Sequence, residues 1–547
     1  MFFRQKKAGG HTYLQIVESR WEDGQSRQRV LTTLGRLDRL QENGQLDSLL
    51  ASGARFAASM TVLTAIQRGE LPIVRTWRLG APMLFERLWR ETGCQEVIHA
   101  LLAERRFEFP VERAIFLEVL HRLVAPGSDR SGYDWKQAYR LEGIEALELH
   151  HAYRAMAWLG EAVGDKGAKL MDLRTTKDLI EEELFARQRD LFTQVEVVFF
   201  DTTSLAFEGE GGETLGERGY SKDHRPDLKQ MVVGVVLDQE GRPLCCELWP
   251  GNTTDVKTLL PIVDRLGQRF GIHRICIVAD RGMISTKTLS ELNERQWPYI
   301  VGARMRSRKE VRDQVLARPG RYQIVHPRRS LKTDPSPLKV KEVWVEDRRY
   351  IVCLNEEQAR RDAADRQAIL ASLEDQLHSG SKSLVGNRGF RRYLKTEGKG
   401  FAIDPERVKN DERYDGKWVL ATNTELAAAE VALAYKQLWQ VEDIFRSMKS
   451  LLATRPIYHR TDQAIRGHVF CSFLALVLRH ELEDRLARKG LGDLEWAKIV
   501  RDLDRLEEVD VEKDGKRFIL RTEVSGVAGK VLQTVGVALP PTIRQAA

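Results

Sequence analysis

The spacing of hydrophobic and polar residues changes near residue 195 and divides the chain into parts of different character. At the N-terminal end, YLQIVESRWEDGQSRQRVLTTLG alternates around the dipeptide Asp23-Gly24, which predicts a β-hairpin. From there to about Gln194, segments such as VERAIFLEVLHRLV and HHAYRAMAWLGEAV repeat apolar residues at helical spacing. This part of the chain is therefore predicted to be mainly helical.

Beyond Val195 the pattern predicts an α/β region. VEVVFF, MVVGVVLD, PLCCELW, RICIVAD and PYIVGA are short and mostly apolar, as strands are, whereas DVKTLLPIVDRLGQRF and STKTLSELNERQ have the spacing of helices. Their order predicts a mixed sheet with helices packed on it. A last strand, KWVLATN, precedes a long helix from about Glu425 to Leu452, and the apolar helix HVFCSFLALVLRH follows.

These changes predict six segments along the 547 residues. They are a β-hairpin with a linker (1–75), a helical region (76–194), the first part of an α/β core (195–303), a β-rich insertion (304–414), the second part of the core (415–470) and a helical C-terminal region (471–547).

Composition argues against a membrane-spanning, secreted or disulfide-rich protein, and the positive charge favours a partner that is negatively charged. No apolar run approaches the roughly 20 residues that span a bilayer, and no signal-peptide core is present. The six Cys form no CxxC pair, so neither a zinc site nor a disulfide framework is indicated, and a reducing cytoplasm fits. The net charge is +7, but residues 304–349 alone hold 14 Lys and Arg against 6 Asp and Glu. This window is predicted to contact DNA phosphates.

Candidate chemistry lies at two strand ends and on one helix. Asp201 ends the strand VEVVFFD and Asp280 ends RICIVAD, so the two carboxylates are candidates for one divalent-metal site, although a turn or capping role explains either Asp alone. On the long helix an apolar stripe runs through Ala434, Leu438, Val441, Phe445, Met448 and Leu452. Tyr435, Glu442 and Lys449 follow stripe positions at intervals of seven, on one shoulder of this buried face.

On these residues the chain resembles the DDE transposases of bacterial insertion sequences, in the superfamily named for insertion sequence four. Their signature helix carries Tyr, then Arg, Glu and Lys at fixed spacing. Tyr435, Glu442 and Lys449 match it, and Leu438 stands at the Arg position. The resemblance also covers FFDTTSLAFEG, GYSKDHRPDLKQ, PGNTTD, VADRGM, DGKWVLATN and RPIYHR, between about Val195 and Arg460.

The resemblance implies an α/β fold of the RNase H-like type, with a mixed-sheet catalytic core, a mostly β insertion and a largely helical DNA-binding region before it. It implies that Asp201, Asp280 and Glu442 are the catalytic residues and the ligands of Mg²⁺, for which Mn²⁺ can substitute. The metal would then compensate the charge of Asp201. Two metal ions activate the attacking water and stabilise the leaving oxygen in such sites.

Further side chains are candidates for DNA contact. Tyr435 and Lys449 are placed beside the cleaved bond by the resemblance, and Arg446 is a candidate replacement for the Arg missing at Leu438. In the loop after the first strand the candidates are Lys222, His224, Arg225 and Lys229, and in the insertion Arg328, Arg329 and Trp344. Trp344 would stack on an unpaired base, although packing within a strand is the commoner role of Trp. Asp223, Asp227 and Asp255 are interpreted as loop-capping residues, and Asp443 is ranked below Glu442.

Three functions fit this pattern. The first is a cut-and-paste transposase that acts on double-stranded DNA, namely the terminal inverted repeats of its element and the target. It would work as a homodimer in a synaptic complex and be cytoplasmic and nucleoid-associated. The alternatives are a catalytically inactive DNA-binding regulator and an RNase H-like nuclease without strand transfer. The three acidic positions argue against the regulator, and the basic insertion with the large helical region argues against the nuclease.

Overall fold

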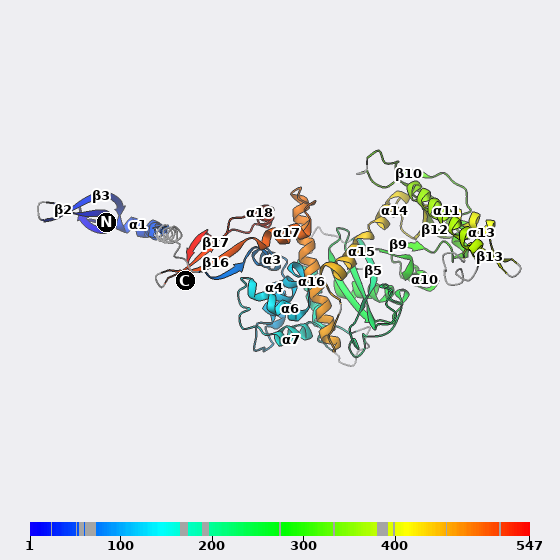
Figure 1. Ribbon diagram of the computed structural model, residues 1–547, viewed down its shortest axis with the longest axis horizontal. Helices are drawn as coiled ribbons and strands as arrows, with labels where there is room; N and C mark the ends of the chain where they lie inside the picture. Colours follow the sequence, from blue (N-terminus) through cyan, green and yellow to red (C-terminus); the bar gives the residue numbers. More distant parts are fainter. Residues whose placement is uncertain are drawn as a thin grey trace. The chain divides into compact units, whose positions relative to one another are not determined.

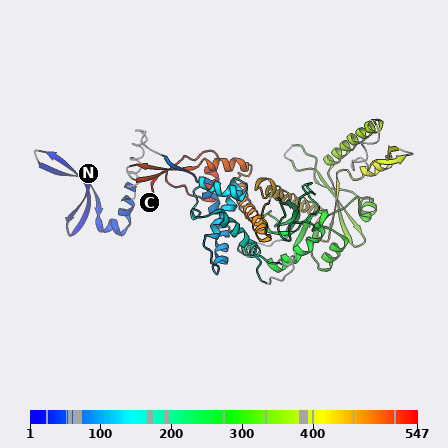
Figure 2. The ribbon, with the colours of Figure 1, turned by 60° about the horizontal axis from the view of Figure 1, so that its bottom comes forward.

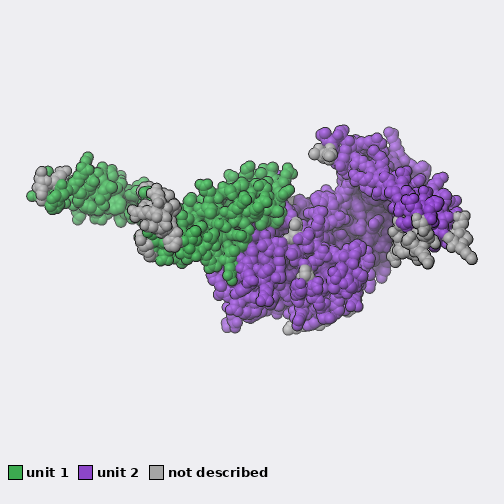
Figure 3. Space-filling view, in the orientation of Figure 1, with its two compact units in different colours: residues 1–84, 137–141, 489–547 green, residues 85–136, 142–488 purple. Residues whose placement is uncertain are grey.

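A computed structural model describes the chain at residues 1–22, 25–50, 52–53, 60, 73–164, 173–188, 196–272, 275–331, 334–379, 392–397, 400–455, 457–513 and 516–546. The chain divides into two compact units (Figure 3). Unit 1 comprises residues 1–84, 137–141 and 489–547, and unit 2 comprises residues 85–136 and 142–488. Within the described residues, no helix combines the length and the apolar character that crossing a membrane requires.

Unit 1 contains two antiparallel sheets. The first consists of β1 (Phe2–Ala8), β2 (His11–Glu22) and β3 (Gln25–Arg36), with β2 in the middle. The predicted hairpin is confirmed as the β2–β3 pair, and its Asp23-Gly24 turn lies outside the described residues. The short helix α1 (Leu37–Glu42) follows β3.

The second sheet of unit 1 joins segments far apart in the sequence. Its strand order is β18-β17-β16-β4, formed by Ile543–Gln545, Lys516–Arg521, Glu507–Lys513 and Ile73–Arg78. The C-terminal region, predicted as helical, thus contains three strands beside the helices α17 (Trp496–Asp504) and α18 (Ala528–Val535). Val511 on β16 and Phe518 on β17 are buried in one apolar cluster, whereas Glu508 and Asp510, which alternate with the Val residues of β16, are buried in ion pairs with Arg140.

The region between residues 76 and 194 is helical, as predicted. Its α-helices are α3 (Gly80–Glu91), α4 (Cys94–Leu102), α5 (Val111–Val124), α6 (Asp129–Trp135), α7 (Leu149–Leu159) and α8 (Thr176–Gln188). In unit 2 the long helix α16 (Asp462–Arg488) packs against α5 and α7 (Figure 1). Helix α5 is buried almost throughout, and Ala155, Met156 and Leu159 of α7 are buried with it. The apolar spacing of these segments therefore marks core helices.

A nine-stranded sheet forms the centre of unit 2. Its order is β10-β11-β12-β15-β9-β8-β5-β6-β7. The five strands of the core are β5 (Val197–Ala206), β6 (Gln230–Leu237), β7 (Pro243–Pro250), β8 (Cys276–Ala279) and β9 (Tyr299–Ala303). Strands β5, β8 and β9 are parallel, whereas β6 and β7 form an antiparallel meander beside β5. This order and these directions are those of the RNase H-like fold, so the predicted fold class is confirmed.

One face of this sheet is packed against helices α9 (Leu259–Phe270) and α10 (Thr286–Glu294). Val198 and Phe200 of β5 and Ile277 and Ala279 of β8 belong to the apolar cluster on that face. Because side chains alternate along a strand, Asp201 and Asp280 belong to the opposite face.

The insertion extends the sheet and adds a small lobe. Strands β10 (Gln323–His326), β11 (Leu338–Val345) and β12 (Arg348–Leu354) pair in turn, and β12 pairs with β15 (Lys417–Thr422) of the core. The lobe contains α11 (Glu356–Ser379), the hairpin β13 (Leu394–Glu397) and β14 (Gly400–Ile403), and α13 (Pro405–Glu412) around Leu373, Tyr393 and Leu394 (Figure 2). The predicted β insertion therefore also contains helices, among them α11 and α13.

The long helix predicted from about Glu425 to Leu452 is divided into three pieces. They are α14 (Ala428–Lys436), α15 (Trp439–Arg446) and a π-helical turn, η6 (Ser447–Leu451). At the break, the amides of Gln437 and Leu438 bond to carbonyls three residues earlier. Helix α14 packs on β8, β9, β11 and β12, whereas α15 packs on β5 and β6, so each piece follows its own part of the twisted sheet. The predicted apolar stripe is buried at Val441, Phe445 and Met448.

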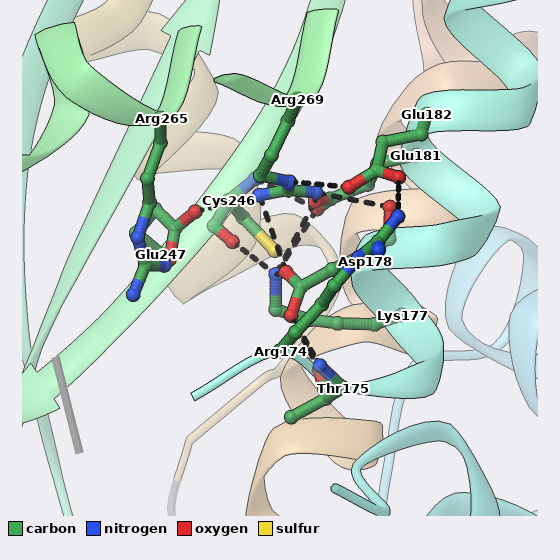
Figure 4. Close-up of polar contacts among 10 residues, drawn as sticks. All are labelled: Arg174, Thr175, Lys177, Asp178, Glu181, Glu182, Cys246, Glu247, Arg265 and Arg269. Carbon is green, nitrogen blue, oxygen red and sulfur yellow. Dashed lines mark hydrogen bonds and ion pairs between the residues drawn. The ribbon is translucent and has the colours of Figure 1, made fainter. Parts of the chain in front are cut away.

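A buried ion network attaches α8 to the core sheet (Figure 4). Lys177 Nζ lies 2.6 Å from Asp178 Oδ1, and it donates to the Cys246 carbonyl of β7 at 2.7 Å. Arg269 of α9 pairs with Glu181 at 2.7 Å and with Glu247 at 2.8 Å. Because buried charges are costly unless paired, these contacts fix α8 against β7 and α9.

Candidate active site

The register of two parallel strands places Asp201 beside Asp280. The last pairs between β5 and β8 are Phe199 with Val278 and Phe200 with Ala279. Asp201 follows Phe200 within β5, and Asp280 follows Ala279 directly after the end of β8. Strand β5 continues to Ala206 along β6, where Asp201 faces Val235, so Asp201 does not end its strand as predicted. Asp201 lies within β5 at the level where the shorter neighbouring strand β8 ends.

The Asp201 carboxylate is largely enclosed and close to other acids. Its Oδ1 accepts a hydrogen bond from the Thr202 amide at 2.7 Å, and Lys222 Nζ lies 3.8 Å away. Burial raises the pKa of Asp201 to about 6 against the opposing effects of Lys222 and the Thr202 amide, and the charges of Asp280 and Asp255 raise it further. Asp201 is thus a carboxylate whose surroundings favour an added cation.

Asp280 is held by Tyr435 of α14. The Tyr435 hydroxyl donates to Asp280 Oδ1 at 3.0 Å. Burial and the charge of Asp280 raise the pKa of Tyr435 far above its ordinary value, so the hydroxyl keeps its proton and remains a donor. Gly302 of β9 makes room for it: a Cβ at this position would lie 2.6 Å from the Tyr435 hydroxyl and 3.0 Å from the Arg281 amide. Tyr435 therefore contacts an acidic residue of the site, which the sequence did not indicate.

Asp255 lies with Asp201 and Asp280, and we call these three residues the acidic group. The interpretation of Asp255 as a loop cap is therefore wrong. Its Oδ1 accepts from the Thr202 hydroxyl at 2.8 Å, and its Oδ2 lies 3.4 Å from Lys222 Nζ. Lys222 donates to the Thr202 carbonyl at 2.5 Å. The motif PGNTTD was the only sequence signal for Asp255, because a loop acid has no periodic pattern to mark it.

Asp223, the residue after Lys222, reaches the signature helix. It lies 2.8 Å from Lys449 Nζ and 2.6 Å from a guanidinium nitrogen of Arg455, so it too is an ion-pair partner rather than a cap. Burial lowers the pKa of Lys449, although Asp223 opposes this effect. His224 has a φ of 57°, a left-handed conformation that is uncommon for residues other than Gly. The loop thus turns sharply directly after Lys222 and Asp223.

Glu442 lies on α15, which packs on β5 and β6, and its side chain is exposed. Within the part of the chain that the structure describes, Asp201, Asp280 and Glu442 do not bring ligand atoms within 4.8 Å of one another; the group that does is Asp129, His459 and His468. In that second group, however, an Arg122 nitrogen lies 2.9 Å from His468 Nδ1 and 3.4 Å from Asp129 Oδ1. A guanidinium therefore already neutralises it, and we assign it no metal.

Most of the other DNA-contact candidates form local ion pairs. Arg225 pairs with Asp227, Lys229 with Glu210, Arg446 with Asp443, Arg328 with Glu356 and Arg329 with Glu357. Trp344 is half exposed on β11 and donates to Glu342 at 2.6 Å. Trp344, Arg349 and Asn423 are among the residues that line a cavity of about 790 Å³.

The acidic group fits a hard divalent cation. Its donors are carboxylate oxygens, which Mg²⁺ and Mn²⁺ prefer, and Asp201 and Asp280 lie side by side in the register of two neighbouring interior strands. Adjacent, partly buried carboxylates repel each other, and a cation between them would remove this cost. These residues could therefore hold the metal that the resemblance implies.

Comparison with known proteins supports the resemblance. Residues 194–478 match the family model described as transposase DDE domain, and residues 3–64 match the N-terminal domain of IS1634 family transposases. A search of curated proteins finds no match. Solved structures that are similar include a piggyBac transposase synaptic complex with hairpin DNA, at 10% identity, a TM-score of 0.36 and 77% coverage of both chains. A Mos1 transposase paired-end complex has 11% identity and a TM-score of 0.15, with 36% of this chain and 60% of that one covered.

The matched DDE domain spans more than half of the chain, and the acidic group lies within it. The chain therefore belongs to the family of transposases with a DDE domain. At its N-terminal end, residues 3–64 are similar to the N-terminal domain of IS1634 family transposases. Membership of the superfamily named for insertion sequence four stays a prediction.

Proposed function

We propose that this transposase binds the terminal inverted repeats of an insertion sequence, cleaves the DNA at the element's ends and joins them to target DNA. The observation that supports the proposal is the register of β5 and β8, which sets Asp201 and Asp280 side by side on one face of the sheet. Asp201, Asp280 and Glu442 would hold Mg²⁺, or Mn²⁺ in its place. When bound, the metal supplies an activated water and stabilises the leaving 3′ oxygen.

The chain's own residues have separate roles in this proposal. Tyr435 orients Asp280 through its hydroxyl, and Lys449 provides a positive charge for a phosphate near the cleaved bond. Glu442 would complete the set of carboxylates when DNA is bound. The partner is double-stranded DNA, held by a homodimer in a synaptic complex in the nucleoid of the cytoplasm. Recognition of the repeats by residues 76–194 remains part of the proposal.

The test is a cleavage assay on a labelled fragment that carries an end of the element, with and without Mg²⁺. We expect specific cleavage that requires the metal. Asp201→Asn, Asp280→Asn and Glu442→Gln should abolish cleavage while DNA binding persists. Asp443→Asn is the matched control, because Asp443 neighbours Glu442 but points about 100° away around the helix; it should cleave like the wild type.

The outcomes separate the alternatives. Binding to the ends without cleavage under any metal would favour a DNA-binding regulator. Cleavage without joining of the ends to a target plasmid would favour a nuclease without strand transfer. Metal-dependent cleavage by any one of the three acidic variants would remove that residue from the site.

A further inference from the structure

The ammonium group of Lys222 lies inside the acidic group. Besides donating to the Thr202 carbonyl, its Nζ lies 3.1 Å from the Thr202 hydroxyl, 3.4 Å from Asp255 Oδ2 and 3.8 Å from Asp201 Oδ1. Its side chain is 30% exposed, so the ammonium is partly enclosed rather than solvated on a free loop. One positive charge thus faces two carboxylates from different segments of the chain.

Asp255 keeps Lys222 in this place. Asp255 begins the short helix η2 (Asp255–Lys257), which precedes α9. One of its carboxylate oxygens accepts a hydrogen bond from Thr202, and the other forms an ion pair with Lys222. The Thr202 hydroxyl and carbonyl lie on β5 directly after Asp201. The contacts among Asp255, Thr202 and Lys222 therefore form a small polar network beside Asp201. This network is separate from the contact of Tyr435 with Asp280.

We propose that Lys222 is a tethered cation that competes with the divalent metal for Asp201 in the DNA-free protein, and that Asp255 is the positioning residue that retains it. This inference rests on the proposed function, in which Asp201 is a metal ligand. An ammonium and a divalent cation repel each other when they share a carboxylate. The flexible stem of Lys222 lets it withdraw, and a DNA phosphate offers it a new partner. Metal would then bind tightly mainly when DNA is present, which restricts cleavage to the complex.

The first test measures Mn²⁺ affinity of the DNA-free, full-length protein by isothermal titration calorimetry. Lys222→Met should raise the affinity about tenfold, which corresponds to about 1.4 kcal/mol. Lys222→Arg should behave like the wild type, because it keeps the charge. Lys287→Met is the matched control: Lys287 is 87% exposed on α10, and its replacement changes the net charge equally. An affinity of Lys222→Met equal to or below that of the wild type would overturn the inference.

The second test uses the wild-type protein and does not depend on the folding of a variant at position 222. Acetylation of Lys222 by a small amine-reactive reagent is followed by mass spectrometry, with Lys287 as the internal reference. Adding Mn²⁺ should speed acetylation of Lys222 because the metal displaces its ammonium. Asp255→Asn should speed it without metal because the anchor is removed. Unchanged rates in both comparisons would show that Lys222 is not held as proposed.

Asp201→Asn distinguishes failure of this inference from failure of the proposed function. If this variant binds Mn²⁺ as tightly as the wild type, Asp201 is not a metal ligand and the proposed site itself is wrong. If it loses Mn²⁺ binding while Lys222→Met gains none, the proposed site stands and only the role of Lys222 is rejected.

Discussion

The Tyr435 hydroxyl donates a hydrogen bond of 3.0 Å to Asp280, so a helix residue seven positions before Glu442 is tied to a carboxylate at the end of β8. The contact connects the signature helix to the sheet on which the acidic pair stands. Under the proposed function, in which Asp280 holds the metal, the contact would give Tyr435 the role of orienting a metal ligand, and direct contact of Tyr435 with DNA stays a prediction.

Tyr435→Phe removes this hydrogen bond and keeps the ring. We expect single-turnover cleavage at saturating Mg²⁺ and DNA to slow about tenfold, as for the loss of one hydrogen bond to a charged group. Affinity for the DNA ends should stay unchanged. Because the pKa of Tyr435 is raised, the hydroxyl stays protonated, and the deficit should be the same at pH 7 and pH 9. Tyr13→Phe on β2 is the control, and a wild-type rate for Tyr435→Phe would contradict the assignment.

Lys449 and Asp223 should act as a unit, because their charged atoms are 2.8 Å apart and both are largely enclosed. Lys449→Ala should slow cleavage and weaken binding of the ends without changing Mn²⁺ affinity. Asp223→Asn should do the same more mildly, since Lys449 remains but loses its orientation. The double variant should cleave no more slowly than Lys449→Ala alone. Full additivity of the two effects in single-turnover assays would show that the pair is not coupled.

The basic insertion should contribute to the salt dependence of DNA binding. The side chain of Arg328 is 72% exposed, and Arg329 is its neighbour in the chain. Reversing both to Glu should reduce the slope of log affinity against log salt by roughly 2, because each phosphate that is no longer neutralised accounts for about 0.9. Filter binding over a range of NaCl concentrations measures the slope, and the double reversal Arg501→Glu with Arg505→Glu on and after α17 is the control. The same slope for the insertion variant and the wild type would exclude this surface.

Lys177 is predicted to be essential for stability and not for chemistry. Lys177→Met leaves Asp178 and Glu181 buried with one partner fewer, which should lower the free energy of unfolding by about 3–5 kcal/mol. Urea denaturation followed by circular dichroism measures the change. Arg174→Met, which removes a half-exposed partner of Glu182, should cost less than about 1 kcal/mol. Equal losses of unfolding free energy in the two variants would mean that the buried ion network around Lys177 is not what holds α8 against the sheet.

The sequence predicted the elements that depend on local pattern. The apolar runs around Asp201 and Asp280 define β5 and β8, and the stripe through Val441 and Phe445 defines the buried face of the signature helix. It could not predict the contacts that loops make, because Asp255, Lys222 and Asp223 lie outside any periodic segment and their pairing depends on how the chain returns to the sheet. The break at Leu438 was missed for a related reason: packing on two parts of a twisted sheet, not the apolar spacing, divides α14 from α15.

Gly302 offers a way to silence this protein from a position that carries no functional group. A single added methyl at that point of β9 would press on the Tyr435 hydroxyl and on the Arg281 backbone, and so disturb the support of Asp280 although no acidic residue is replaced. A genetic screen for loss of transposition should therefore recover changes in this apolar strand as well as in the acidic motif. Gly302→Ala would be a starting point for an engineered DNA-binding scaffold that retains the natural charge of the face that carries Asp201 and Asp280.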